Sequence, residues 1–272
     1  MFIYYIYKMA VTLQLGDGQD HTITGRCVIN GEDYEYVSAM DGHGTGHTKN
    51  ACISLMRTID FDMVASQADP VNFIHNTYLK SHNLINSGST FTYARINNTT
   101  RKIDVVNVGD SMTVVLKNGK IVYKSPIHCF QNPVEIERTK TLVSYIKNAK
   151  APFPVNDIDV HLLESNIGVW NTGEILVPSQ SFGHNNVTGL APSYMSLTYE
   201  LEDRVRIICG TDGFWDMNMI KYPYLSIEDP QRLINVAARK WNQQWMYYDG
   251  ENAAVQTKFD HADDIGIAVW DN

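Results

Sequence analysis

Aspartates beside glycines, at the ends of apolar runs, are the residues of this chain most clearly suited to chemistry. Asp41 follows an apolar run and opens the segment 41–44 (Asp-Gly-His-Gly), and Asp212 follows another run and precedes a glycine. Asp263 stands just before the last apolar run, and Asp20 follows a glycine-rich stretch. Carboxylates at such points suit Mg²⁺ and Mn²⁺, which take oxygen ligands. A neighbouring glycine lets its carbonyl or a water approach the same ion.

These acids leave two interpretations open. Several carboxylates that converge on one point repel one another, and a pair of divalent ions would resolve that conflict. A single Asp-Gly after a strand is more often a simple turn, in which the aspartate bonds its own backbone. Which of the two holds depends on whether the predicted strands bring the acids together.

Alternating β-branched and aromatic residues predict strands. Asn118-Gly119 lies between two such runs and predicts a two-residue hairpin turn, because both residues accept a positive φ at low cost. Residues 97–101 predict a second, longer hairpin, and hairpins indicate antiparallel sheet. The predicted strands are 34–40, 91–96, 103–108, 112–116, 121–124, 205–211 and 265–270.

Helix starts recur in one form, a capping residue followed by proline. Asp69-Pro70, Asn132-Pro133 and Asp229-Pro230 have this form, and a further helix is predicted from residue 48 to about residue 58. Glu135 stands three residues after the capping Asn132 and predicts a capping box. Strands and helices in segregated runs indicate an α+β domain.

Composition limits the class of protein. The 272 residues carry 30 acids and 22 bases, a net charge of −8, which argues against binding to nucleic acid or an anionic membrane. Four cysteines without a CxxC pair predict free thiols in a reducing compartment, and therefore a cytoplasmic protein. The apolar start, residues 1–8, predicts a strand, unless Met9 is the first residue of the protein. We expect one domain over residues 1–272 with an irregular, flap-like segment at 148–200.

Six short motifs follow one another along roughly residues 15–270. They are Gln19-Asp20, Asp41-Gly42-His43-Gly44, Ser87-Gly88-Ser89-Thr90, Val106–Ser111 (Val-Asn-Val-Gly-Asp-Ser), Thr211–Asp216 (Thr-Asp-Gly-Phe-Trp-Asp) and Asp263-Asp264-Ile265. In their order and residue types, these motifs resemble those of the metal-dependent protein serine/threonine phosphatases of type 2C. The resemblance implies an αββα sandwich of two antiparallel sheets flanked by helices. It also implies hydrolysis of phosphoserine and phosphothreonine in proteins, with two Mg²⁺ or Mn²⁺ ions.

The resemblance further implies a ligand for each metal position. Asp41 would bridge both ions, and Asp212 and Asp263 would complete the shell of the first ion. The carbonyl of Gly42 would face the second ion, and Asp20 would act mainly through bound water.

His43 would be the general acid that protonates the departing seryl oxygen, a task suited to imidazole. Asp110 and Asp216 also lie inside family motifs. We interpret them as turn-forming and loop-bonding residues and not as ligands.

The chain departs from the family pattern around this core. Leu15 stands where the family has an arginine that holds the substrate phosphate, and Ile127 stands where it has the aspartate of a third, weaker metal site. Gln180 and His184 replace an arginine and an aspartate of another motif, and Thr45 replaces a glycine. A missing guanidinium loses bidentate phosphate recognition.

Three hypotheses follow from this pattern. We favour an active phosphatase that acts on a phosphoprotein as a monomer, with Arg26, His21 or Lys49 taking over from the lost arginine. The second hypothesis is a phosphatase-fold binding or regulatory protein with weak or no catalysis. The third is a metal-dependent hydrolase of phosphates that are not proteins.

Overall fold

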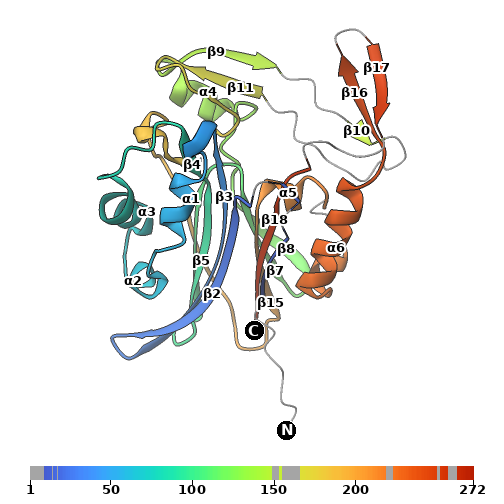
Figure 1. Cartoon of the computed structure of the whole chain (residues 1–272). Helices are drawn as coiled ribbons and strands as arrows, with labels where there is room; N and C mark the ends of the chain where they lie inside the picture. Colours follow the sequence, from blue (N-terminus) through green and yellow to red (C-terminus); the bar gives the residue numbers. More distant parts are fainter. Residues whose placement is uncertain are drawn as a thin grey trace.

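Two antiparallel sheets pack face to face with helices on both outer faces, as the computed structural model shows (Figure 1). The structure describes residues 9–13, 15–16, 18–148, 153–154, 166–218, 223–249, 252–256 and 262–272. The strand predicted at residues 1–8 lies outside these ranges. Helices between residues 51 and 74 cover one outer face, and the helix at residues 230–241 covers the other. The predicted αββα arrangement and α+β class are confirmed.

The first sheet is organised around β3 (Glu32–Gly44), a strand of 13 residues. Among the described strands its order is β13-β4-β3-β5-β6-β14, and β2 also pairs with β3. β2 and β5 flank the first part of β3, and β4 pairs with its last three residues. The neighbours are β2 (Asp20–Ile29), β4 (Ser87–Ser89), β5 (Phe91–Asn97), β6 (Lys102–Val108), β13 (Phe182–Gly183) and β14 (Ser193–Thr198).

The second sheet has the order β1-β18-β15-β7-β8 in the described part of the chain. Its pairings are antiparallel, as the hairpin signals predict. All seven predicted strands are found in the two large sheets, with ends that differ by at most a few residues. The strands of this sheet are β1 (Met9–Leu13), β7 (Met112–Lys117), β8 (Lys120–Lys124), β15 (Val205–Gly210) and β18 (Ile265–Asp271).

Two-residue turns close the tight hairpins. Asn118 and Gly119 join β7 to β8 with φ values of 53° and 75°, which confirms the predicted turn. Asn30 and Gly31, with φ values of 53° and 84°, join β2 to β3 in the same way. The β2–β3 pair matters for function because its register places Asp20 opposite Asp41.

Smaller sheets lie outside the sandwich. One has the order β12-β11-β9 and lies beside α4 (Pro133–Thr139) (Figure 1). The other has the order β10-β16-β17. Their strands are β9 (Val143–Asn148), β10 (Phe153–Pro154), β11 (Asn166–Trp170), β12 (Ile175–Leu176), β16 (Trp245–Asp249) and β17 (Asn252–Gln256).

Capping residues begin the helices that the sequence predicts. The side chains of Asp69, Asn132 and Asp229 each accept a backbone N–H of the first turn. The helix predicted at 48–58 is shorter, α1 (Ala51–Met56), after a 3₁₀ turn. The remaining α-helices in the described part of the chain are α2 (Phe61–Ala65), α3 (Pro70–Ile74), α5 (Asp212–Trp215) and α6 (Pro230–Trp241). Among the described residues, no helix has the length and apolar character to cross a membrane.

The predicted capping box at Glu135 is wrong. Its carboxylate accepts hydrogen bonds from Arg138, Ser179 and Gln180 instead of from the backbone of Asn132. A buried carboxylate is better compensated by a guanidinium and further donors than by one amide, and the fold brings them within reach. Glu135 therefore ties α4 to the segment before β13.

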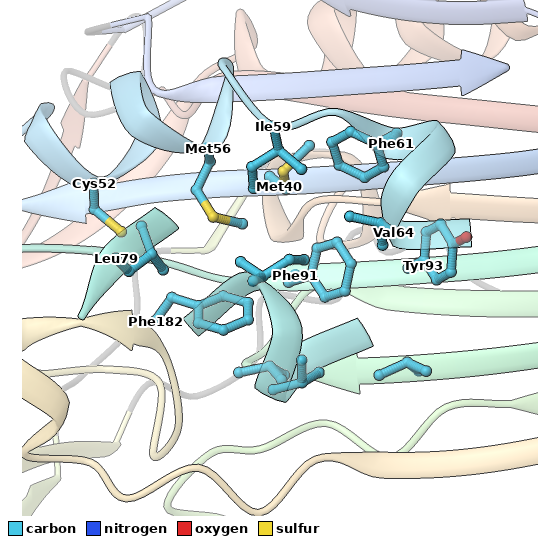
Figure 2. Close-up of a cluster of buried hydrophobic side chains, with 14 of the residues drawn as sticks. Met40, Cys52, Met56, Ile59, Phe61, Val64, Leu79, Phe91, Tyr93 and Phe182 are labelled. Atoms are coloured by element: carbon cyan, nitrogen blue, oxygen red, sulfur yellow. The ribbon is translucent and has the colours of Figure 1, made fainter. Parts of the chain in front are cut away.

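Buried side chains form three layers that match the sandwich. One layer lies between the first sheet and helices α1–α3; Figure 2 shows Met40, Met56, Phe61 and Phe91 among its members. A second lies between the two sheets and includes Ala94, Ile207 and Trp270. A third lies between the second sheet and α5 and α6. These layers hold both sheets rigid up to the strand ends where the acids stand.

His128 is a buried bridge between the turn after β6 and the edge strand β14. Its Nδ1 accepts the backbone N–H of Gly109 at 3.1 Å, and its Nε2 lies 2.8 Å from Ser193 Oγ. Because Nδ1 accepts, the ring is neutral with its proton on Nε2. Burial lowers the pKa of His128 to about 4, which Glu135 opposes and Arg138 reinforces.

Acid should therefore weaken the fold through His128. The folded pKa lies below the ordinary value, so the stabilisation is complete above about pH 6.5 and is lost as the pH falls towards 4. The loss attributable to this ring is up to about 3 kcal/mol. His128→Asn keeps an acceptor for Gly109 but does not titrate. Urea unfolding at pH 7 and pH 5 should show a smaller loss in the variant, and an equal loss in both proteins would contradict this assignment.

Candidate metal centre

Three aspartates from separate elements converge at one end of the sandwich. One carboxylate oxygen each from Asp41, Asp110 and Asp212 lies within 4.8 Å of the other two. Asp41 belongs to β3 in the first sheet, whereas Asp110 follows β6 and Asp212 opens α5 directly after β15. The centre therefore exists only where the two sheets are packed together.

Asp41 is held at the point where β3 leaves its pairing with β5. Its backbone N–H donates to Thr90 Oγ1 at 3.0 Å, and its carbonyl accepts the N–H of Thr90 at 2.8 Å. A side chain on Gly42 would lie 2.7 Å from Ile53 of α1, so the Asp41 and His43 side chains take the opposite face of the strand. Gly42 thereby lets helix α1 pack directly against the strand that carries the acid.

Asp20 lies opposite Asp41 in the β2–β3 ladder. Its Oδ2 accepts the hydroxyl of Thr211 at 2.7 Å, which links the first sheet to the end of β15 in the second. Its Oδ1 is buried and has no hydrogen-bond partner among the described residues. Because an unpartnered buried carboxylate oxygen is costly, this atom is suited to a ligand or a bound water.

The two consecutive acids before β18 have different surroundings. Asp264 accepts the backbone N–H groups of Leu15, Gly16 and Gln19 at 2.6–3.0 Å, so it fixes the loop before β2. Asp263 accepts the N–H of Asp264 and is close enough to Asp41 to raise the pKa of that carboxyl. Asp263 is therefore close to the acidic cluster, whereas Asp264 holds the loop before β2 in place.

Asp110 is the member of the cluster that sequence reasoning missed. It follows Gly109, whose φ of 96° and close approach to Thr90 turn the chain sharply. Asp110 is only 5% exposed, and its Oδ1 has no hydrogen-bond partner within the described structure. The turn role that we expected is compatible with this geometry, but the carboxylate is directed at Asp41 and Asp212. The signal was available, because Asp110 also follows glycine at the end of a buried strand.

The cluster is electrostatically unfavourable by itself. Burial raises the pKa of every one of these carboxyls, and neighbouring negative charges raise most of them further. Asp212 is the neighbour that raises the pKa most often, because it lies centrally. A divalent cation would remove this repulsion, and an all-oxygen donor set fits Mg²⁺ or Mn²⁺. The carboxyls concerned are Asp20, Asp41, Asp110, Asp212 and Asp263.

His43 lies two residues beyond Asp41 on the same face of β3. Its Nδ1 is 3.1 Å from Nε2 of His184, and its own Nε2 is buried without a partner in the described residues. Burial, with His184 as the smaller cause, lowers the pKa of His43 to about 3, so the ring is neutral in the free protein.

The expected substitutes for the lost phosphate arginine are differently placed. Arg26 pairs with Asp33 near the far hairpin and is remote from the acids. His21 follows Asp20 in β2, and Lys49 is at the end of the 3₁₀ turn before α1. The guanidinium beside the 18–20 loop is that of Arg57, whose Nη2 donates to the carbonyls of residues 18 and 20.

Two of the other departures from the family pattern, Ile127 and Gln180, are built into the fold. Ile127 packs against the core beneath α6, so an apolar residue replaces a ligand there. Gln180 is fully buried; it donates to Glu135 and accepts the N–H of Ala191. Arg138 supplies the guanidinium of this network, with Nη2 donating to both Glu135 and the Ser179 carbonyl.

Known proteins resemble this chain in sequence. The family model for protein phosphatase 2C matches residues 30–219. Probable protein phosphatase 2C 59 and probable protein phosphatase 2C 69 of Arabidopsis thaliana are 27% and 26% identical over 225 and 222 residues. Each alignment covers 75% of this chain, but only 63% and 56% of the relatives, so the chain spans less than two thirds of their length.

Solved structures share the fold. A serine/threonine phosphatase of S. agalactiae has a TM-score of 0.59 at 15% identity, covering 98% of this chain and 99% of that one. A serine-threonine phosphatase 2C of Toxoplasma gondii has the same score and identity, covering 100% and 96%. The catalytic domain of the phosphatase PstP, solved with two manganese ions, has a TM-score of 0.52 at 14% identity, covering 98% and 97%. With the family match over most of its length, the chain belongs to the protein phosphatase 2C family of metal-dependent serine/threonine phosphatases.

Proposed function

We propose that this protein hydrolyses phosphoserine and phosphothreonine in a protein substrate, with two Mg²⁺ or Mn²⁺ ions. The observation that carries the proposal is the convergence of Asp41, Asp110 and Asp212 within 4.8 Å. Buried carboxylate oxygens without partners, on Asp20 and Asp110, support it further. Such a site is unstable as an isolated group of charges and becomes favourable when cations bind.

The proposed ligands follow from position. Asp41 would be held in common by both ions, because it is near every other acid of the cluster. Asp212 and Asp263 would hold one ion, and the Gly42 carbonyl and, through water, Asp20 would hold the other. Asp110, whose carboxylate lies close to that of Asp212, would be a further ligand beyond those that the family motifs imply. Two bound divalent ions would supply water activation and neutralise charge on the phosphoryl group.

His43 is the proposed proton donor to the departing seryl or threonyl oxygen. Its position on the Asp41 face of β3 and its unpartnered Nε2 support this role. A phosphate dianion beside the ring would oppose the effect of burial, because a nearby negative charge raises the pKa of imidazole.

The remaining features of the protein are proposals of the same kind. Residues 1–272 act as one phosphatase domain, which is supported by a centre assembled from residues between 20 and 263. The protein acts as a monomer. Free cysteines, three of them buried, support a reducing, cytoplasmic location.

A second candidate function is a binding or regulatory protein with little catalysis. Leu15 and Ile127 favour it, because they remove a phosphate-binding guanidinium and a metal ligand. In that case the fold is stable, but turnover is absent even with Mn²⁺.

Turnover should depend on the metal centre. We expect the protein to hydrolyse a phosphoserine peptide with Mn²⁺ and to lose that activity with a chelator. Asp41→Asn should lower kcat by at least about 100-fold, because the metal contributes several kcal/mol to the transition state. Exposed Glu202→Gln is the matched control and should leave kcat unchanged. Turnover that survives chelation would refute the proposal; turnover only on small phosphate esters would favour a different substrate class.

Metal binding should stabilise the fold through Asp110. At about 100 times the dissociation constant, Mn²⁺ should add about 2.7 kcal/mol to the free energy of unfolding of the native chain. Asp110→Asn should be at least as stable as the native chain in chelator, because one repelling charge is gone, and should gain less from Mn²⁺. Calorimetry and urea unfolding would measure both effects. Equal stabilisation of both proteins by Mn²⁺ would exclude Asp110 as a ligand.

A further inference from the structure

Two histidines that are 141 residues apart in the sequence form one hydrogen-bonded pair beside the acidic cluster. His43 Nδ1 and His184 Nε2 are 3.1 Å apart, and the two rings are nearly parallel, with 19° between their planes and 5.0 Å between their centroids. His184 is only 2% exposed. The pair is therefore a buried contact and not a chance approach of surface side chains.

The direction of the hydrogen bond follows from the next residue in the chain of contacts. His184 Nδ1 lies 3.2 Å from the carbonyl oxygen of Ile85, and a carbonyl can only accept, so this nitrogen carries the proton. In neutral His184 the Nε2 is then an acceptor, and His43 Nδ1 must donate to it. The lone pair of His43 consequently lies on Nε2, the atom without a partner.

The backbone is shaped to bring the two rings together. His43, Gly88 and Gly183 form one row across β3, β4 and β13. A side chain on Gly88 would lie 2.5 Å from His184 Nε2 and 2.6 Å from His43 Cε1, so the rings occupy the space that its hydrogen leaves free. Glycine at this position is thus a condition for the contact.

His184 also has a backbone conformation that favours glycine. His184, Asn185 and Asn186 have φ values of 45°, 48° and 63°, and such residues persist only where the surroundings impose them. Asn185 supplies that constraint, because its Oδ1 accepts the N–H of Leu84 and its Nδ2 donates to Asn83. The strained turn is fixed to the segment that presents the Ile85 carbonyl.

We propose that His184 is a positioning residue, which holds the His43 ring with Nδ1–H bound and Nε2 directed to the reacting phosphate ester. This inference rests on the proposed function. With Nδ1–H bound to His184, the His43 ring can take up a solvent proton only on Nε2; it passes that proton to the serine or threonine oxygen as the P–O bond breaks and returns to the neutral form with Nδ1–H. In this role His184 acts through its hydrogen bond to His43 and not on the substrate directly.

Two substrates with different leaving groups test this role. A seryl oxygen needs a proton as it departs, whereas p-nitrophenolate leaves without one. We expect His184→Leu to lower kcat on a phosphoserine peptide by about 10- to 100-fold and to change kcat on p-nitrophenyl phosphate by less than about threefold. His184→Gln, which offers an acceptor oxygen at a similar reach, should restore most of the loss.

The controls separate positioning from structural damage. His43→Gln should show the same substrate dependence, and adding His184→Leu to it should cause little further loss. Exposed His82→Leu should change neither rate. An equal loss on both substrates in His184→Leu, or no loss on either, would overturn the proposal.

A nuclear magnetic resonance measurement tests the same inference without turnover. Imidazole nitrogen shifts should show His43 protonated on Nδ1 in the native chain and a mixture of tautomers in His184→Leu. Native His43 protonated on Nε2 would overturn the inference. If the native chain hydrolyses neither substrate while His43 has the Nδ1–H form, the proposed function fails and the hydrogen-bonded arrangement stands.

Discussion

Mutual repulsion among buried carboxylates is the constraint on which the rest of this structure depends. Asp41, Asp110 and Asp212 place negative charge within a few ångströms, in surroundings where burial already disfavours the charged form. Such an arrangement persists only if the backbone that carries it cannot relax apart. The three apolar layers provide that rigidity, since each sheet is packed on both faces up to the strand ends.

Small polar residues connect the acids to this frame. Thr211 joins Asp20 to the second sheet, and Thr90 joins Asp41 to the strand beside it. The carboxylate of Asp264 accepts hydrogen bonds from backbone N–H groups and so fixes the loop before β2. Beside these contacts, one carboxylate oxygen each of Asp20 and Asp110 is left without a hydrogen-bond partner among the described residues.

Much of the fold could be predicted from local pattern. Helix caps and tight turns depend on a few neighbouring residues, so the sequence alone predicts them. Examples are the caps at Asp69, Asn132 and Asp229 and the turn at Asn118-Gly119. Strand β2 was not among the predicted strands, although Asn30-Gly31 is a hairpin signal and Ile23, Cys27 and Ile29 alternate toward the core. Apart from exposed Val28, its remaining residues are polar or small, which weakens the apolar periodicity.

The candidate site also has a part that the sequence predicts and a part that only the fold determines. By itself the sequence determined the residue types at the strand ends, the ordered motifs and hence the family, because these depend on chemistry at single positions. It also named Asp20, Asp41, His43, Asp212 and Asp263 one by one. Only the tertiary structure decided that Asp110 joins the cluster, that Glu135 binds Ser179 and Gln180 instead of capping its helix, and that His184 contacts His43. Each of these contacts depends on packing between segments that are tens of residues apart in the sequence. The distance between such segments is set by sheet register and by the volume of the core, so it cannot be predicted from a local sequence pattern.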